Sequence, residues 1–305
     1  MSMLRAGFIA AIILYAAVPG ARAATSVVIV EGLGGNDRYT TEFAAQTADI
    51  EAAARTLRPA PEIRIFRDTQ ATREDILAYL EQLGLRAGAT DLLLIYLVGH
   101  GSFDEHDYKF NLPGPDLSDS DLLDAFGAFG NRNVVVINTS SASGAAHDRW
   151  QGDSRVVITA TRSGVERHAT RFGTYFAAAL SDPGADVDKN DRVSAQEAFD
   201  YASREVTAYF ESSGQLATEH ARISGAAAGR IALALLGAPR TARGDPAPGP
   251  LLRRRDELAG QVDALRLARD EMPAERYQQE LLQLMLELAE IEERIEQAEA
   301  DGPPR

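Results

Sequence analysis

Two apolar runs of the sequence end in residues that could carry out acyl-transfer chemistry. The run 91–98 (DLLLIYLV) ends just before His100 and Gly101, and the run 133–137 is followed by a serine-rich segment around Ser141. Runs with little polar alternation are typical of strands buried on both faces of a parallel sheet. The carboxyl ends of such strands meet at one edge of an α/β sheet, where functional groups are usually placed. The sequence therefore predicts an imidazole and a hydroxyl at the same edge.

The order of these motifs resembles the caspase and legumain superfamily of cysteine peptidases. In that family a His-Gly pair follows one strand and the nucleophilic cysteine follows the next. The legumain-like motif E-A-C-x-S-G is similar to residues 139–144 (TSSASG), which place Ser141 at the cysteine position, and the chain contains no cysteine. Residues 159–164 (TATRSG) resemble the Ala-Thr strand end that lines the substrate cleft of legumain-like enzymes, and residues 110–114 (FNLPG) resemble bacterial members. The whole resemblance runs from about residue 27 to residue 234.

The resemblance implies a fold and a set of site residues. The fold would be a three-layer caspase-like α/β domain with a mainly parallel sheet between helices. His100 would be the general base, and Gly101 would lend its backbone N–H to the oxyanion hole. Asn36 lies slightly out of register with the asparagine that orients the imidazole in legumain, and Asp104 and Asp107 are alternatives for that role.

Serine at position 141 bears directly on activity. A free cysteine thiol has a pKa of about 8.5, and a neighbouring imidazolium lowers this pKa further. A serine hydroxyl is far less acidic and needs a base in direct contact, oriented by a third group. We therefore expect a catalytically degenerate homologue, a pseudoprotease that binds a peptide or protein partner. The alternatives are an active peptidase or acyl hydrolase that uses Ser141, or Ser140, with His100, and a coiled-coil scaffold protein.

A second group of oxygen-bearing residues has the spacing of a calcium-binding loop. The candidate ligands, at loop positions 1, 3, 5, 7, 9 and 12, are Asp186, Asp188, Asn190, Arg192 through its carbonyl, Ser194 and Glu197. Calcium prefers such oxygen ligands, although the usual glycine at position 6 is Asp191 here. Ser194 and Glu197 also fit a capping box at the start of a helix, which is the alternative interpretation. Ca²⁺ is the only cofactor that the sequence suggests, because the histidines lack the spacing of zinc ligands.

Apolar runs that alternate with amphipathic segments predict the order of the elements. Strands are expected at 26–30, 63–66, 91–98, 107–111, 133–137 and 155–160. Helices are expected at 40–57, 72–83, 120–129, 170–180 and 194–210. Strands that alternate with helices favour a parallel sheet covered on both faces.

The amino-terminal segment 1–23 has the pattern of a signal peptide. Arg5 precedes an apolar stretch at 6–18, and Ala21-Arg22-Ala23 forms a small-x-small cleavage motif, so the mature chain is expected to begin at Ala24. The stretch is shorter than the roughly 20 apolar residues needed to cross a bilayer. We therefore expect an exported protein, periplasmic or secreted, with no membrane span after cleavage.

The carboxyl-terminal part differs in composition from the main domain, which we place at 24–237. Residues 238–250 are rich in Pro, Gly and Ala, which is typical of a linker. In residues 251–300, Leu and Ile recur at heptad spacing on both sides of Pro273. This pattern predicts either a helical hairpin packed within one chain or a coiled coil through which chains self-associate. Residues 301–305 form a short tail.

The net charge of −14 bears on the class of partner. Domains that bind nucleic acid carry basic patches, so this excess of acidic residues argues against a nucleic-acid partner. The length of 305 residues suits one sizeable domain with an appendage.

Overall fold

The computed structural model describes most of the chain. The described residues are 23–130, 132–236 and 272–300, together with 251, 254, 255, 258, 260–262, 265 and 269. Nearly all of the predicted signal peptide, the linker at 238–250 and the tail at 301–305 lie outside them. Within the described residues, none of the helices has the length and apolar character that crossing a membrane requires.

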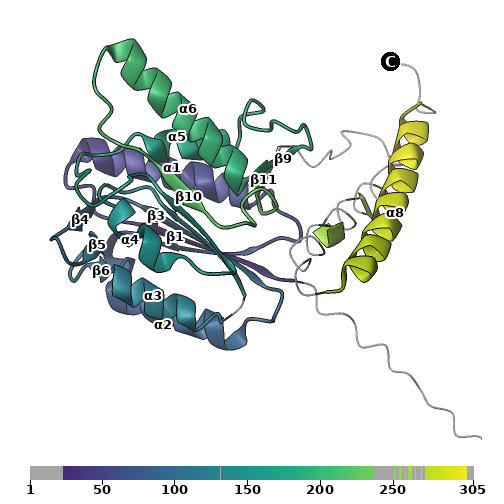
Figure 1. Cartoon of the computed structure of the whole chain (residues 1–305), viewed down its shortest axis with the longest axis horizontal. Helices are drawn as coiled ribbons and strands as arrows, with labels where there is room; N and C mark the ends of the chain where they lie inside the picture. The colour runs from purple at the N-terminus through teal and green to yellow at the C-terminus, as the bar shows by residue number, and fades with distance from the viewer. Residues whose placement is uncertain are drawn as a thin grey trace, which may run out of the picture.

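A six-stranded sheet forms the centre of the protein, with the strand order β10-β8-β7-β3-β1-β2 (Figure 1). The strands are β1 (Thr25–Glu31), β2 (Glu62–Phe66), β3 (Leu92–Val98), β7 (Asn133–Asn138), β8 (Arg155–Thr159) and β10 (Arg222–Ser224). All neighbours are parallel except the edge strand β10, which runs antiparallel to β8. The strand β3 is buried along its whole length, as its continuous apolar sequence predicts.

Helices cover both faces of the sheet and complete three layers. One face carries α1 (Asp37–Ala54), α5 (Phe172–Ala179) and α6 (Ala195–Ser213), and the other carries α2 (Arg73–Arg86), α3 (Asp119–Gly127) and α4 (Gly144–Trp150) (Figure 1). Alternate residues of β3 enter two separate apolar cores: Leu94 packs on the α1 side and Leu93 on the α2 side. The predicted fold class, a mainly parallel α/β sheet between helices, is confirmed.

Two smaller sheets stand beside the central one. The first contains β4 (Gly101–Phe103), β5 (Tyr108–Phe110) and β6 (Leu117–Ser118), so the strand predicted at 107–111 lies outside the main sheet. The second pairs β9 (Arg192–Ser194) with β11 (Ala232–Leu235). The short helix α4 and the edge strand β10 were not predicted, because neither is long enough to show a periodic pattern.

The long carboxyl-terminal helix α8 (Ala274–Ala300) has two apolar faces. One face joins a small cluster that contains Leu258, Ile291 and Ile295, with Leu251, Leu284 and Leu288 packed against it. The other face exposes Leu282, Met285 and Leu286. Residues on both sides of Pro273 therefore contact each other within one chain, as a hairpin requires, and self-association stays a prediction.

Candidate functional site

Neighbouring strands bring the two sequence motifs to the carboxyl edge of the sheet. Leu97 of β3 pairs with Asn138 of β7, so the loops that follow these strands begin at the same level. Gly101 and Ser141 are in hydrogen-bond contact across the two loops. The two loops meet because neighbouring parallel strands end at a common edge of the sheet, as the sequence predicted.

The Ser141 hydroxyl is bonded to backbone groups. Its Oγ donates to the Gly101 carbonyl at 2.9 Å and accepts from the Gly101 N–H at 3.3 Å. Between the described side chains of Ser141 and His100 there is no hydrogen bond, and Ser141 is only 4% exposed. The serine proton is thus directed at a carbonyl, and the serine oxygen faces the N–H that the resemblance assigns to an oxyanion hole.

His100 lies in an aromatic pocket beside α1. Its ring makes edge contacts with Tyr39 and Phe43, at centroid distances of 4.7 and 4.9 Å. Burial lowers the pKa of His100, although a hydrogen bond to the Gly34 carbonyl and the charge of Glu42 act in the opposite direction. The imidazole is therefore uncharged at neutral pH and can accept a proton.

The backbone of Gly34 also acts on His100, and sequence reasoning missed it. Asn36 is the N-cap of α1, where its side chain accepts a backbone N–H of the first turn at 3.1 Å. Gly34, two residues earlier, is the residue whose backbone raises the pKa of His100 against the effect of burial. Asp104 accepts the N–H groups of its own turn. The Gly-rich segment after β1 was the sequence signal that could have indicated Gly34, because glycines in turns let the backbone approach another group closely.

A buried hydrogen-bond network stabilises the serine loop, residues 139–144, which carries Ser141. Tyr108 Oη lies 2.6 Å from Ser140 Oγ, and Asn138 Nδ2 donates to Tyr108 Oη at 2.9 Å. Ser140 Oγ also donates to Asn138 Oδ1 at 2.8 Å. The three residues are fully buried, so Ser140 has no access to a substrate. These contacts join β5 to β7, and no sequence motif indicated them.

The segment after β8 holds the serine loop from the other side. Ala142 has a positive φ of 56°, and its N–H donates to the Glu166 carbonyl at 2.8 Å. The Gly144 N–H donates to Thr161 Oγ1 at 2.8 Å. Glu166 is bonded in turn to His220 Nδ1 at 2.7 Å. The Ala-Thr strand end thus contacts the serine motif, and His220 borders the site without any motif that could have identified it.

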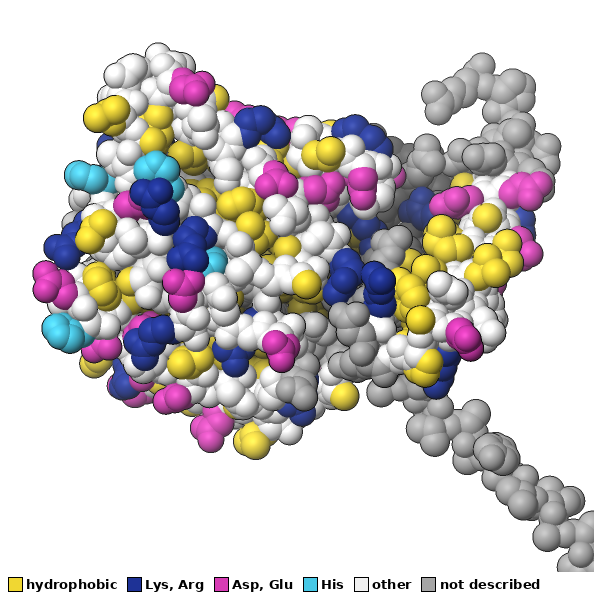
Figure 2. All heavy atoms as spheres, viewed as in Figure 1, with side chains coloured by type: hydrophobic (Ala, Val, Ile, Leu, Met, Phe, Trp, Pro, Cys, Tyr) yellow, Lys and Arg dark blue, Asp and Glu magenta, His cyan; other side chains and the backbone are white. Residues whose placement is uncertain are grey.

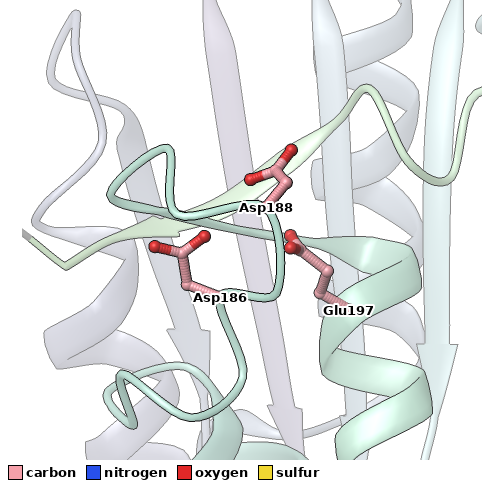
Figure 3. A group of neighbouring side chains, drawn as sticks. All are labelled: Asp186, Asp188 and Glu197. Atoms are coloured by element: carbon pink, nitrogen blue, oxygen red, sulfur yellow. The ribbon is translucent and has the colours of Figure 1, made fainter.

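The predicted calcium ligands extend from the loop after α5, through β9, to the first turn of α6. Carboxylate oxygens of Asp186, Asp188 and Glu197 lie within 4.8 Å of one another, and the three side chains surround one turn of the loop (Figure 3). Asp191, at the position that is usually glycine, adopts a φ of 60°, the left-handed conformation that favours glycine. This set of oxygen donors fits a calcium ion.

The same carboxylates are bonded to the loop itself. The Asn190 N–H donates to Asp186 at 3.1 Å, and a loop N–H donates to Glu197 at 2.9 Å. Ser194 and Glu197 form the reciprocal capping box of α6, and Arg192 opens β9. Helix cap and ion ligands therefore use the same residues, and calcium binding stays a prediction.

Comparisons with known proteins bear on the fold alone. No family model matches the chain, and no curated protein matches its sequence. Protein GSU0716 from Geobacter sulfurreducens is similar in structure, with a TM-score of 0.47 and 12% identity, over 70% of this chain and 100% of that one. Caspase-1 from Spodoptera frugiperda is similar with a TM-score of 0.43 and 9% identity, over 67% of this chain and 87% of that one. At these values neither likeness carries an argument about activity.

Proposed function

We propose that this chain is an exported homologue of caspase/legumain-like peptidases that binds a peptide or protein segment without cleaving it. The observation that carries the proposal is the bonding of Ser141, whose hydroxyl is paired on both sides with the Gly101 backbone. Export and the relation to that superfamily rest on the sequence motifs.

A hydroxyl in this setting is a poor nucleophile. Its proton must pass to a base in hydrogen-bond contact before Oγ attacks a carbonyl carbon, and the carbonyl of Gly101 is not such a base. The Gly101 N–H is also bonded to Ser141 Oγ at 3.3 Å, so it must give up that partner before it can bond an oxyanion. Loss of one oxyanion donor costs about 2.7–4 kcal/mol of transition-state stabilisation in a serine peptidase.

Two exposed apolar side chains belong to the loops that carry residues of the site, and they suit a bound peptide. Leu33 is 46% exposed and precedes Gly34, whose backbone raises the pKa of His100. Val165 is 76% exposed and precedes Glu166, which holds the serine loop. An extended peptide could cover both side chains with its own apolar groups while its backbone meets polar groups between them.

An active serine–histidine hydrolase is the alternative, and one observation favours it. The lowered pKa favours the uncharged form of His100, and Tyr39 and Phe43 contact its ring. A potential base is therefore in place, and the contact with Ser141 is what this alternative lacks.

Covalent labelling distinguishes the two functions. We expect no stoichiometric reaction of the native protein with a fluorophosphonate. Ser141→Cys carries the only thiol in the chain, so its alkylation by iodoacetamide is the control that reagents reach this position. Stoichiometric label on native Ser141 that disappears in His100→Ala would establish the hydrolase instead.

Peptide selection tests the binding function. A phage-displayed random peptide library is selected on the native protein, and the Kd of a selected peptide is measured by fluorescence polarisation. We expect Leu33→Asp and Val165→Asp each to weaken binding at least about tenfold, equivalent to about 1.4 kcal/mol. Leu85→Asp, at an 82% exposed position on α2, is the matched control and should not change Kd. Equal binding to all variants would place the peptide elsewhere.

A further inference from the structure

The backbone nitrogen of Ala24 is fixed against a carboxylate at the amino edge of the sheet. It lies 2.8 Å from Asp91 Oδ1, and the other Asp91 oxygen accepts the Gly88 N–H at 2.7 Å. The Ala24 carbonyl accepts the Leu92 N–H at 2.9 Å. Both backbone groups of Ala24 are therefore held by the segment that begins β3.

Ala24 lies at the surface, with open space beside it. It lines a cavity of about 160 Å³ together with Ser26, Glu62, Arg86 and Asp91. Ala24 itself is exposed and Ala23 is half-buried. The bond between these two residues is the one at which the signal-peptide motif predicts cleavage.

We propose that cleavage of the Ala23–Ala24 bond creates an ion pair between the new amino terminus and Asp91. A peptidase adds water across the amide bond, and the new carboxylate leaves with residue 23. Ala24 keeps the amine, which takes up a proton because the reference pKa of such a group is about 8. An amide hydrogen bond in the precursor thus becomes a charged one in the mature protein. The inference rests on the predicted cleavage, which the proposed export shares, and it is independent of the proposed peptide binding at Ser141.

The charged groups near the new amino terminus determine how its contribution to stability depends on pH. Asp91 contacts the nitrogen directly, whereas Glu62 and Arg86 line the same cavity and pair with each other at 2.6 Å. Arg132 bonds the Gly88 carbonyl, next to Asp91. A close carboxylate favours the charged ammonium and raises its pKa. The added stability is present below the unfolded-state pKa and is lost as the pH rises through the folded-state pKa.

The small number of amines makes this pKa measurable. The sequence contains two lysines, Lys109 and Lys189, so reductive ¹³C-methylation of the mature protein gives three kinds of labelled amine. Mature protein is isolated from cells that express the full chain, and the labelled groups are titrated by NMR. We expect the Ala24 pKa to fall by at least about half a unit in Asp91→Asn. Asp200→Asn, at an exposed carboxylate on α6, is the matched control and should leave it unchanged.

Two further measurements keep the inference open to contradiction. A mature chain with Gly-Ser added before Ala24 keeps the amide hydrogen bond and moves the charge away, so the raised pKa should be lost. If Asp91→Asn does not fold, the native titration decides, and an Ala24 pKa at or below about 8 overturns the proposal. N-terminal sequencing that finds a mature chain beginning at another residue also overturns it.

Discussion

His100 and His147 show how the surroundings of a histidine determine its pKa and its role. Burial is the main cause that lowers the pKa of both His100 and His147 from the usual value of 6.5. His100 borders the candidate site with its ring against Tyr39 and Phe43, and its uncharged form is a potential base. His147 is 1% exposed on α4, with Nδ1 3.0 Å from Thr159 Oγ1, and it belongs to the interior.

His147 should make the protein sensitive to acid. Its pKa is lowered to about 4, so the unfolded chain binds a proton that the folded chain does not. Stability from this residue is complete above about pH 6.5 and is lost as the pH falls, by about 3 kcal/mol at pH 4. We expect His147→Asn, which keeps a polar group near Nδ1, to show a shallower loss in urea unfolding between pH 7 and pH 4. The exposed His106→Asn should follow the native curve. Parallel curves for the native protein and His147→Asn would contradict this assignment.

Short elements at the ends of longer ones position the candidate residues. The sheet β4-β5-β6 places Tyr108 beneath Ser140, at the carboxyl end of β7. The pairing of β9 with β11 fixes residues 192–194, which are the part of the predicted calcium-binding loop that leads into α6. Each site therefore depends on a pairing between segments that are far apart in the chain.

Calcium should raise the melting temperature of protein that has first been treated with a chelator. An ion that binds only the folded state stabilises it by about 2.7 kcal/mol at one hundred times its Kd. Asp188→Asn removes one ligand charge and should reduce the shift, whereas Asp200→Asn on α6 should retain it. No shift at millimolar calcium in the native protein would leave the capping box as the only role of Glu197.

The two apolar faces of α8 should respond differently to charge. Leu284→Asp with Leu288→Asp places carboxylates against the cluster around Leu258, so we expect lower helicity by circular dichroism. The matched control, Leu282→Asp with Leu286→Asp, alters exposed positions and should retain helicity. A fall in oligomer size in the control alone would instead indicate that the exposed face joins chains.

In the whole molecule, the candidate site and the Ala24–Asp91 contact lie at opposite edges of the central sheet. The carboxyl edge of the sheet holds His100 and Ser141, and the opposite edge holds Ala24 and Asp91. The space-filling view shows apolar side chains gathered on the surface of the α8 region (Figure 2). That region approaches the main domain near Arg58, because a Cβ at Gly260 would lie 3.3 Å from the Arg58 carbonyl. This contact lies on the connection between α1 and β2, beyond the far end of α1 from His100.

Removal of residues 251–305 should leave the main domain folded. Among the described residues, the two apolar cores contain none from that region, so we expect one cooperative melt shifted by no more than about 4 °C, equivalent to about 1 kcal/mol. Differential scanning calorimetry measures the melt, and light scattering reports whether oligomer size falls. Loss of the cooperative transition would show instead that the carboxyl-terminal helices are part of the core.

The sequence by itself determined the layers of the fold and the edge at which the candidate residues meet. Apolar runs such as 91–98 specify strands buried on both faces, and parallel strands must end together. It did not determine which partner each polar group takes, because a hydrogen bond depends on ångström-scale approach between distant segments. Only the tertiary structure paired Ser141 with the Gly101 backbone, placed the His100 ring against Tyr39 and Phe43, and used Asn36 as a helix cap.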